Sequence, residues 1–333
     1  MSPRQFVFGV STVLALVGIW GIAQAQNSFT LRIGGGSPGS SVQAGAAGLS
    51  ILLNKESRDP KLMTTALGTD GATANVRLVE SGEAQLGVTA ATSMYSSLKG
   101  GGAFKGEKPY KNWMAVVPQG FVPLYGVAKK ETGIAKLSDI QGKSIALGPA
   151  GSGTGATWHQ LLPVLGLTGN FRHMPFREGN QRLRDGLVSA HLMGVSRLSA
   201  ALEAESYLGD DAVWFGISNP KYQKLAKERF PALSVVTMPA GTYHTQTKPF
   251  STIGYSLWII ARKDAPKKAI YEATKLIVEK GKGNLPGYGA WGQVWDMKLI
   301  PSFDVLKAIG AKLHPGAAAY FKDHGYKIPA AIQ

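Results

Sequence analysis

The sequence contains no cysteine, and this absence excludes several kinds of chemistry at once. Without a thiol, the chain has no disulfide bond, no thiolate nucleophile and no cysteine to which a lipid could be attached. Histidine is also rare: the 6 histidines lie far apart, and none has the spacing of a His-Glu-x-x-His metal motif. We therefore expect no metal site and no cofactor.

Long apolar runs are missing except at the N-terminus. Residues 1–25 contain one cation, Arg4, followed by an apolar stretch over about 6–22 and an A-x-A tripeptide at 23–25. This pattern is typical of a secretory signal that is cleaved before Gln26. The alternative is an uncleaved membrane anchor, since a spanning helix needs roughly 20 apolar residues. We favour the signal because the cleavage tripeptide follows the apolar stretch directly, and we expect an exported protein.

Acidic residues are few, with 21 Asp and Glu against 36 Lys and Arg, which gives a formal net charge of +15. The signal segment contributes only Arg4, so +14 remains on the rest of the chain. The cations are scattered, as at Lys129, Lys130 and Lys263. These cations either lie on solvated helix faces or produce a positive field that attracts anionic ligands or an anionic membrane surface. We expect no nucleic-acid partner for an exported chain.

Nucleotide-binding and catalytic motifs are missing as well. No Lys-Ser or Lys-Thr pair follows Gly153 or Gly155, so this glycine-rich stretch is not a phosphate loop, and it lacks the spacing of a dinucleotide fingerprint. Ser152 does not stand in a Gly-x-Ser-x-Gly motif. His159, near a helix start, could face a cleft, although a lone histidine there is more often a capping or packing residue. The sequence therefore predicts binding without catalysis.

What the chain does contain is a series of strand, loop and helix units. The expected strands cover 29–33, 62–67, 86–88 and 144–147, and the expected helices cover 44–54 and 72–81, with a further helix from near Trp158. Such β-α-β spacing is typical of an α/β protein with largely parallel sheets flanked by helices.

The roughly 308 residues after the signal exceed one comfortable core, so we expect two lobes. The first lobe is predicted to comprise 26–122 plus 252–333, and the second 123–251. The stretch 113–128, with two strand-like runs separated by 118–123, is the expected first crossing between them.

The return to the first lobe is expected later in the chain. The second lobe is predicted to continue through 213–215 and 233–238, and a buried strand over 255–261 to lead back to the first lobe, with a helix over 267–280. A late group of aromatic residues has the spacing of a buried helix face and is expected in the core: Tyr288, Trp291, Trp295, Tyr320 and Phe321.

Three loops rich in glycine, serine and threonine follow predicted strands: 34–41, 68–73 and 148–154. Glycine lets the backbone approach a ligand, and the free N–H groups of a following helix attract a carboxylate or phosphate. For any single loop an ordinary turn or helix cap is an equally good explanation. If all three lie at the carboxyl ends of their strands, they face one another across a cleft between the lobes.

The order of these motifs resembles the TAXI family of solute receptors, which serve tripartite ATP-independent periplasmic (TRAP) transporters. The similarity rests on 34–41, on 68–75 with 81–87, on 133–134 with 137–154 and on two late segments, 271–275 and 313–317. It implies a type II, Venus-flytrap binding protein of the periplasm that closes on a small organic anion and delivers it to a TRAP membrane permease. Known members handle glutamate and related dicarboxylates. We expect a monomer.

The resemblance and the three loops together select the candidate ligand-binding residues, which would donate main-chain and hydroxyl hydrogen bonds to a carboxylate. They are Ser37, Ser40, Ser41, Thr69, Gly71, Ser152, Gly153 and Thr154, with Thr89, Thr92 and Arg197 as weaker candidates. No catalytic residue is expected. Departures from the family pattern at 42–43, 89–92 and 189–190 leave the identity of the anion open.

Three other functions fit the same sequence. The chain could be a ligand-sensing receptor without a permease, an exported enzyme on the same fold, or a surface-interaction protein that uses its basic face.

Overall fold

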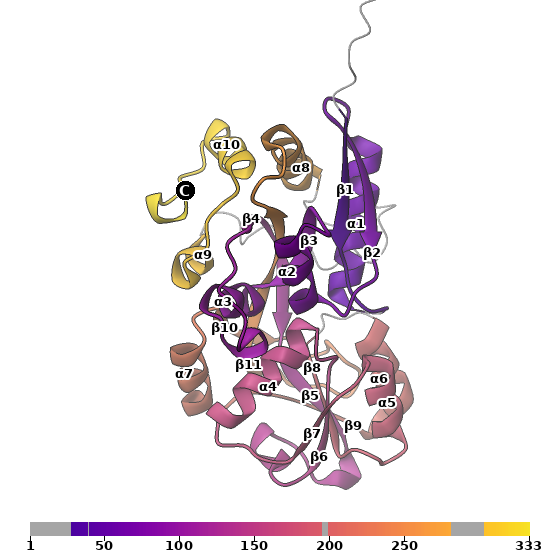
Figure 1. Cartoon of the computed structure of the whole chain (residues 1–333). Coiled ribbons are helices and arrows are strands. Elements are labelled where there is room, and N and C mark those ends of the chain that lie inside the picture. The colour runs from indigo at the N-terminus through magenta and orange to yellow at the C-terminus, as the bar shows by residue number, and fades with distance from the viewer. Residues whose placement is uncertain (1–27, 39, 195–198, 281–302) are drawn as a thin grey trace, which may run out of the picture.

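The computed structural model describes residues 28–38, 40–194, 199–280 and 303–333, and it shows two lobes, each built on a β-sheet (Figure 1). The predicted two-lobed α/β fold is therefore confirmed. The predicted signal over 1–25, Arg197, Tyr288, Trp291 and Trp295 lie outside the described residues. Tyr320 and Phe321 are buried, as expected.

The first sheet has the strand order β10-β11-β3-β1-β2, and β4 also pairs with β11. β1, β2 and β3 are parallel, whereas β11 runs antiparallel to β3, β4 and β10. The strands are β1 (Ser28–Gly34), β2 (Lys61–Leu67), β3 (Leu86–Ala90), β4 (Trp113–Pro123), β10 (Leu233–Met238) and β11 (Phe250–Arg262).

The second sheet has the order β7-β6-β8-β5-β9. β6 is parallel to β7 and β8, and β5 runs antiparallel to β8 and β9. The strands are β5 (Tyr125–Lys129), β6 (Ser144–Leu147), β7 (Asn170–His173), β8 (Ala190–Met193) and β9 (Ala212–Gly216).

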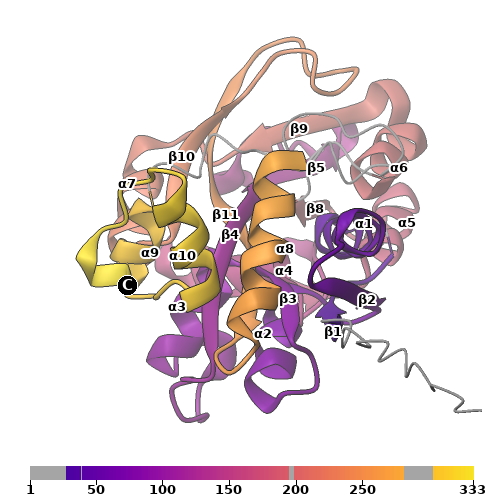
Figure 2. The ribbon, with the colours of Figure 1, turned by 90° about the horizontal axis from the view of Figure 1, so that it is seen from above.

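Helices cover both faces of each sheet, which explains why most strands are apolar on both sides. α1, α8 and α10 pack on one face of the first sheet and α2 and α3 on the other, while α5 and α6 lie opposite α4 on the second sheet (Figure 2). The helices are α1 (Ser41–Glu56), α2 (Ala72–Ser81), α3 (Ala91–Lys99), α4 (Gly153–Val164), α5 (Phe176–Arg184), α6 (Ser199–Leu208), α7 (Pro220–Arg229), α8 (Lys267–Lys280), α9 (Asp304–Ile309) and α10 (Pro315–Asp323).

Two helices begin earlier than predicted, and a serine explains both differences. α1 was expected from 44 and starts at Ser41, while α4 was expected from near Trp158 and starts at Gly153. The side chain of Ser40 caps α1 and that of Ser152 caps α4, each by accepting a backbone N–H of the first turn. Both caps bring the helix N-terminus closer to the preceding strand than apolar periodicity suggests.

The chain crosses between the lobes where expected, with one correction. β4 ends at Pro123 in the first sheet and β5 begins at Tyr125 in the second, and the amide of Leu124 between them donates to the carbonyl of Ile253 in β11 at 2.8 Å. β10 was expected in the second lobe, but it pairs with β11 in the first sheet. An apolar run alone does not show which sheet a strand joins.

The residues after β10 return to the second lobe. The ring of Tyr243 is fully buried and stacks on Trp214 of β9, with centroids 3.8 Å apart. Its hydroxyl donates to that of Tyr125 in β5 at 2.7 Å. β11 then carries the chain back into the first sheet.

Candidate functional site

The N-termini of α1, α2 and α4 meet where the two lobes touch (Figure 1). Each of these helices follows a strand, β1, β2 or β6, through one of the three predicted loops. The sequence therefore identified correctly which loops gather at the interlobe contact.

α1 and α4 begin with the same local arrangement. The hydroxyl of Ser40 accepts the amide of Gln43 at 3.1 Å and donates to the carbonyl of Ser37 at 2.8 Å. The hydroxyl of Ser152 accepts the amide of Gly155 at 2.9 Å and donates to the carbonyl of Pro149 at 2.6 Å. Since these hydroxyls are used within their loops, the main-chain N–H groups of the first two helical residues are the donors that each helix offers outwards.

A small cavity of about 20 Å³ lies between these two helix N-termini. A cavity of this size holds about one water molecule, so a larger solute enters only when the lobes separate. Its lining comprises Ser37, Ser40, Ser41, Val42, Asp70, Gly71, Val122, Ser152, Gly153, Thr154, Phe176, Gly194, Tyr255 and Leu257. Seven of the predicted residues are among them: Ser37, Ser40, Ser41, Gly71, Ser152, Gly153 and Thr154.

The N-terminus of α2 is occupied by the opposite lobe. The amides of Thr73 and Ala74 both donate to the carbonyl of Gly151, at 3.0 and 3.3 Å. A backbone carbonyl carries partial negative charge, so it is a suitable partner for a helix N-terminus. This second loop therefore holds the lobes together in the structure, whereas α1 and α4 face the cavity.

The remaining predicted threonines lie outside the cavity lining and bind other protein groups. Thr69 donates to the carbonyl of Gly35 at 2.8 Å, and Thr89 donates to the carbonyl of Ala72 at 2.7 Å. The hydroxyl of Thr92 lies 2.9 Å from that of Thr157 in the other lobe. Their hydrogen bonds shape the loops and the contact between the lobes.

Tyr255 is a cavity residue that the sequence analysis did not select. Thr154 donates its hydroxyl proton to the carbonyl of Gly194 at 2.8 Å, so Tyr255, 3.0 Å away, donates to Thr154. Burial raises the pKa of Tyr255, which keeps the phenol protonated. The strand pattern of β11 showed that Tyr255 is buried but gave no sign that its hydroxyl reaches the cleft.

The cavity has an apolar wall and little charge. Val42, Val122, Phe176 and Leu257 contribute carbon atoms, and Asp70 is the one charged side chain in the described lining. Asp70 is itself exposed at the edge of the site. The positive potential in this part of the molecule therefore comes from the backbone N–H groups and dipoles of α1 and α4.

A buried histidine supports the cavity wall from behind. The ring of His191 in β8 lies 6.0 Å from that of Phe176, and its Nδ1 is 2.9 Å from Oδ1 of Asn180. Burial lowers the pKa of His191 to about 3, so the ring is neutral at physiological pH. It contributes packing and no positive charge.

A more open groove of about 940 Å³ runs along the same seam outside the cavity. His159 lies in this groove beside His173, with ring centroids 5.1 Å apart. Arg77 of α2 also lines it and forms an ion pair of 2.6 Å with Glu107. In the part of the chain that the structure describes, no group of three or more His, Asp or Glu side chains could hold a metal ion.

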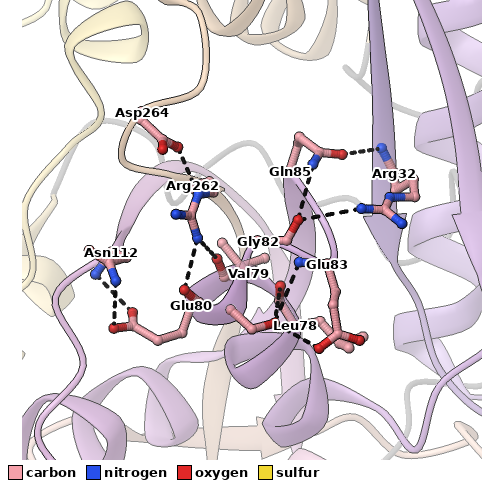
Figure 3. Close-up of polar contacts among 11 residues, drawn as sticks. Arg32, Leu78, Val79, Glu80, Gly82, Glu83, Gln85, Asn112, Arg262 and Asp264 are labelled. Carbon is pink, nitrogen blue, oxygen red and sulfur yellow. Dashed lines mark hydrogen bonds and ion pairs between the residues drawn. The ribbon is translucent and has the colours of Figure 1, made fainter.

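The orientation of α2 is fixed at its far end by β11 and by the segment before β4 (Figure 3). Arg262 donates to the carbonyl of Glu80 at 2.9 Å and forms an ion pair with Asp264 at 2.8 Å. The carboxylate of Glu80 accepts the amide of Asn112 at 2.8 Å. A cation at the carboxyl end of a helix stabilises the last carbonyl groups, so α2 keeps its N-terminus directed at the second lobe.

Comparison with known proteins agrees with this geometry. A family model described as the NMT1-like family matches residues 33–325. The structure of the periplasmic binding protein BugD is 14% identical with a TM-score of 0.55 and covers 90% of this chain and 98% of that one. XAC2383 from Xanthomonas citri, in a structure with bound chloride, is 10% identical with a TM-score of 0.52, and it covers 89% of this chain and 99% of that one.

A third solved structure is the arginine-, lysine-, histidine-binding protein ArtJ from the thermophilic bacterium Geobacillus stearothermophilus. It is 14% identical with a TM-score of 0.50 and covers 84% of this chain and 100% of that one. At these identities the likeness shows a shared two-lobed fold. Among the described helices, none is both long and apolar enough to cross a membrane.

Proposed function

We propose that this chain, which belongs to the NMT1-like family, is a periplasmic solute-binding protein that captures a small organic anion between its two lobes. The ligand class is a carboxylate, such as glutamate or a related dicarboxylate. The protein acts as a monomer that is exported by its N-terminal segment, and it delivers the ligand to the membrane permease of a TRAP-type transporter, as its resemblance to the TAXI receptors implies.

The observation that carries this proposal is the convergence of two capped helix N-termini on one small cavity between the lobes. α1 and α4 come from different lobes, and each is preceded by a serine that orders the turn and leaves two outward N–H groups. A carboxylate accepts from both helices only when the lobes close around it, so it interacts more strongly with that form than with the open one. Binding therefore favours closure.

The best test is a melting-temperature screen of the purified protein with L-glutamate, succinate, 2-oxoglutarate, L-glutamine and lactate. A ligand that binds only the native state stabilises it by about 2.7 kcal/mol at 100 times its Kd. We expect at least one of these carboxylates to raise the melting temperature. A flat screen contradicts the proposed ligand class.

A substitution at Gly153 ties the binding to this site. A Cβ at this position would lie 2.8 Å from the Cβ of Ala90 and 3.2 Å from the hydroxyl of Tyr255. Gly153→Asp therefore places a carboxylate at the N-terminus of α4 and hinders closure, and we expect it to abolish the shift. Gly101→Asp is the matched control, because a Cβ there meets nothing within 4 Å and aspartate suits a helix N-cap. Equal shifts in both variants would rule out this site.

A further inference from the structure

The side chain of Gln119 is an unusual buried group of the first lobe. It belongs to β4 and is fully buried, yet neither its Oε1 nor its Nε2 has a hydrogen-bond partner among the described residues. Nearly all buried polar groups in proteins are paired, because leaving one unpaired loses its interaction with water without compensation. An unpaired buried amide therefore indicates a group that binds something else.

The facing helix makes room for this amide. Gly45 lies inside α1, where glycine is less favourable than alanine. A Cβ at Gly45 would overlap Nε2 of Gln119 and come within 2.8 Å of its Cδ. The glycine is thus the residue that lets the amide of Gln119 lie against the helix. A glycine inside a helix and an unpaired buried amide, each locally unfavourable, are therefore in contact, and positions of this kind are commonly functional.

The same helix face leads directly to the cavity. Ser41 lies one turn before Gly45, about 6 Å away on the same side of α1. Its hydroxyl is also buried and has no partner among the described residues, and Ser41 lines the cavity. The amide of Gln119 fills the space that Gly45 leaves, so it lies on the same side of α1 as Ser41 and about one turn away from it.

We propose that Ser41 and Gln119 form a polar subsite at the inner end of the cleft, which receives an uncharged hydrogen-bonding group of the ligand. A hydroxyl and a carboxamide both donate and accept, so they suit a hydroxyl or carboxamide on the ligand. No cation is present in the described lining, and burying a second unpaired charge is unfavourable. The inference rests on the proposed function and narrows its ligand class: among carboxylates, the site prefers one with a neutral second polar group over glutamate or another dicarboxylate.

The first test needs no ligand. Gln119→Met removes the amide and keeps the shape, so the ligand-free melting temperature should stay equal or rise by about 2 °C, because an unpaired polar group is lost. Asn75→Leu is the control, since Asn75 is an equally buried amide that donates to the carbonyls of Gly35 and Val88, at 2.6 and 2.7 Å. Its melting temperature should fall. A similar fall for Gln119→Met would show a structural role and overturn the proposal.

The second test compares matched probes in the wild type and in Gln119→Met. The wild type should bind lactate about tenfold more tightly than propionate and L-glutamine more tightly than L-glutamate, because one hydrogen-bonded neutral group is worth roughly a factor of ten. Gln119→Met should lose both preferences. If wild type and variant share the same preferences, the subsite is wrong while the proposed function stands. If no carboxylate binds the wild type, the proposed function fails, and the subsite fails with it.

Discussion

The hydrogen bond between Thr92 and Thr157 joins the two lobes, and its removal tests whether closure is coupled to binding. Thr157 donates to the carbonyl of Gly153 at 2.6 Å, so Thr92 is the donor in the 2.9 Å bond between the two hydroxyls. Thr92→Val deletes that donor and changes the shape of the side chain little. Thr157 keeps its other partner, so no new unpaired donor is created.

The size of the effect follows from the burial of this pair. Both threonines are buried, at 6% and 4% exposure, and a buried hydrogen bond contributes about 0.5–1.5 kcal/mol. Because this bond exists only when the lobes touch, its loss lowers the ratio of closed to open protein by roughly 2- to 12-fold. Where the closed form is the minor one, the apparent Kd of the ligand rises by the same factor.

The closed fraction can be measured directly. Since the chain contains no cysteine, Glu83→Cys and Arg172→Cys place one fluorescent label on an exposed position of each lobe. We expect Thr92→Val to shift the energy transfer between the labels toward the open form, and calorimetric titration with the carboxylate found in the screen to show the weaker binding.

A double-mutant cycle with Thr157→Val isolates the pair. We expect a coupling of about 1 kcal/mol between the two positions in the binding free energy. Thr274→Val is the matched control, because Thr274 is a buried threonine whose hydroxyl, among the described residues, donates within α8 to the carbonyl of Ile270. A coupling of zero, or an equal loss of affinity in Thr274→Val, would refute the link between this contact and closure.

Two further predictions concern stability. Burial lowers the pKa of His191 to about 3 in the folded protein, against 6.5 in the unfolded chain. The contribution of His191 to the unfolding free energy is therefore complete above pH 6.5 and decreases as the pH falls toward 3, by up to roughly 1.4 kcal/mol per pH unit. Urea denaturation between pH 7 and 5 should show this slope, and His191→Gln should flatten it. Arg262→Leu removes the bonds to the carboxyl end of α2 and should lower the unfolding free energy by about 1–2 kcal/mol. The control Arg229→Leu, at an exposed position, should change the unfolding free energy by less than about 0.5 kcal/mol in the same denaturation assay.

Much of the fold could be predicted from periodicity. β6, α2 and α8 have the predicted bounds, because each combines a clear apolar pattern with a turn signal at its ends. The start of α4 could not be predicted in this way. Its first residues, such as Gly153 and Thr154, are poor helix formers, and they are helical because Ser152 caps them and because they pack against the opposite lobe.

The sequence predicted the parts of the candidate site that consist of main-chain groups. It did not predict the parts that consist of side chains from strands and helices. Glycine, serine and threonine after a strand indicate a helix N-terminus, which identified the loops of α1 and α4. Tyr255, Phe176 and Gln119 lie in a strand or a helix whose sequence shows burial but not direction. Gln119 in addition lies beside an irregularity in the pairing of β4 with β11, which alternation cannot reveal.

The central position of β11 determines the order in which the protein can assemble as it is synthesised. All strands of the second sheet lie between Tyr125 and Gly216, so that sheet has its full set of strands long before the chain is complete. The first sheet begins at Ser28, but its central strand β11, which lies between β3 and β10, is complete only when Arg262 has been made. The lobe that begins first is therefore finished last. Its early strands β3 and β4 remain without their partner until β11 has been made. The pairing of β11 with these strands is then the slow, non-local step of folding.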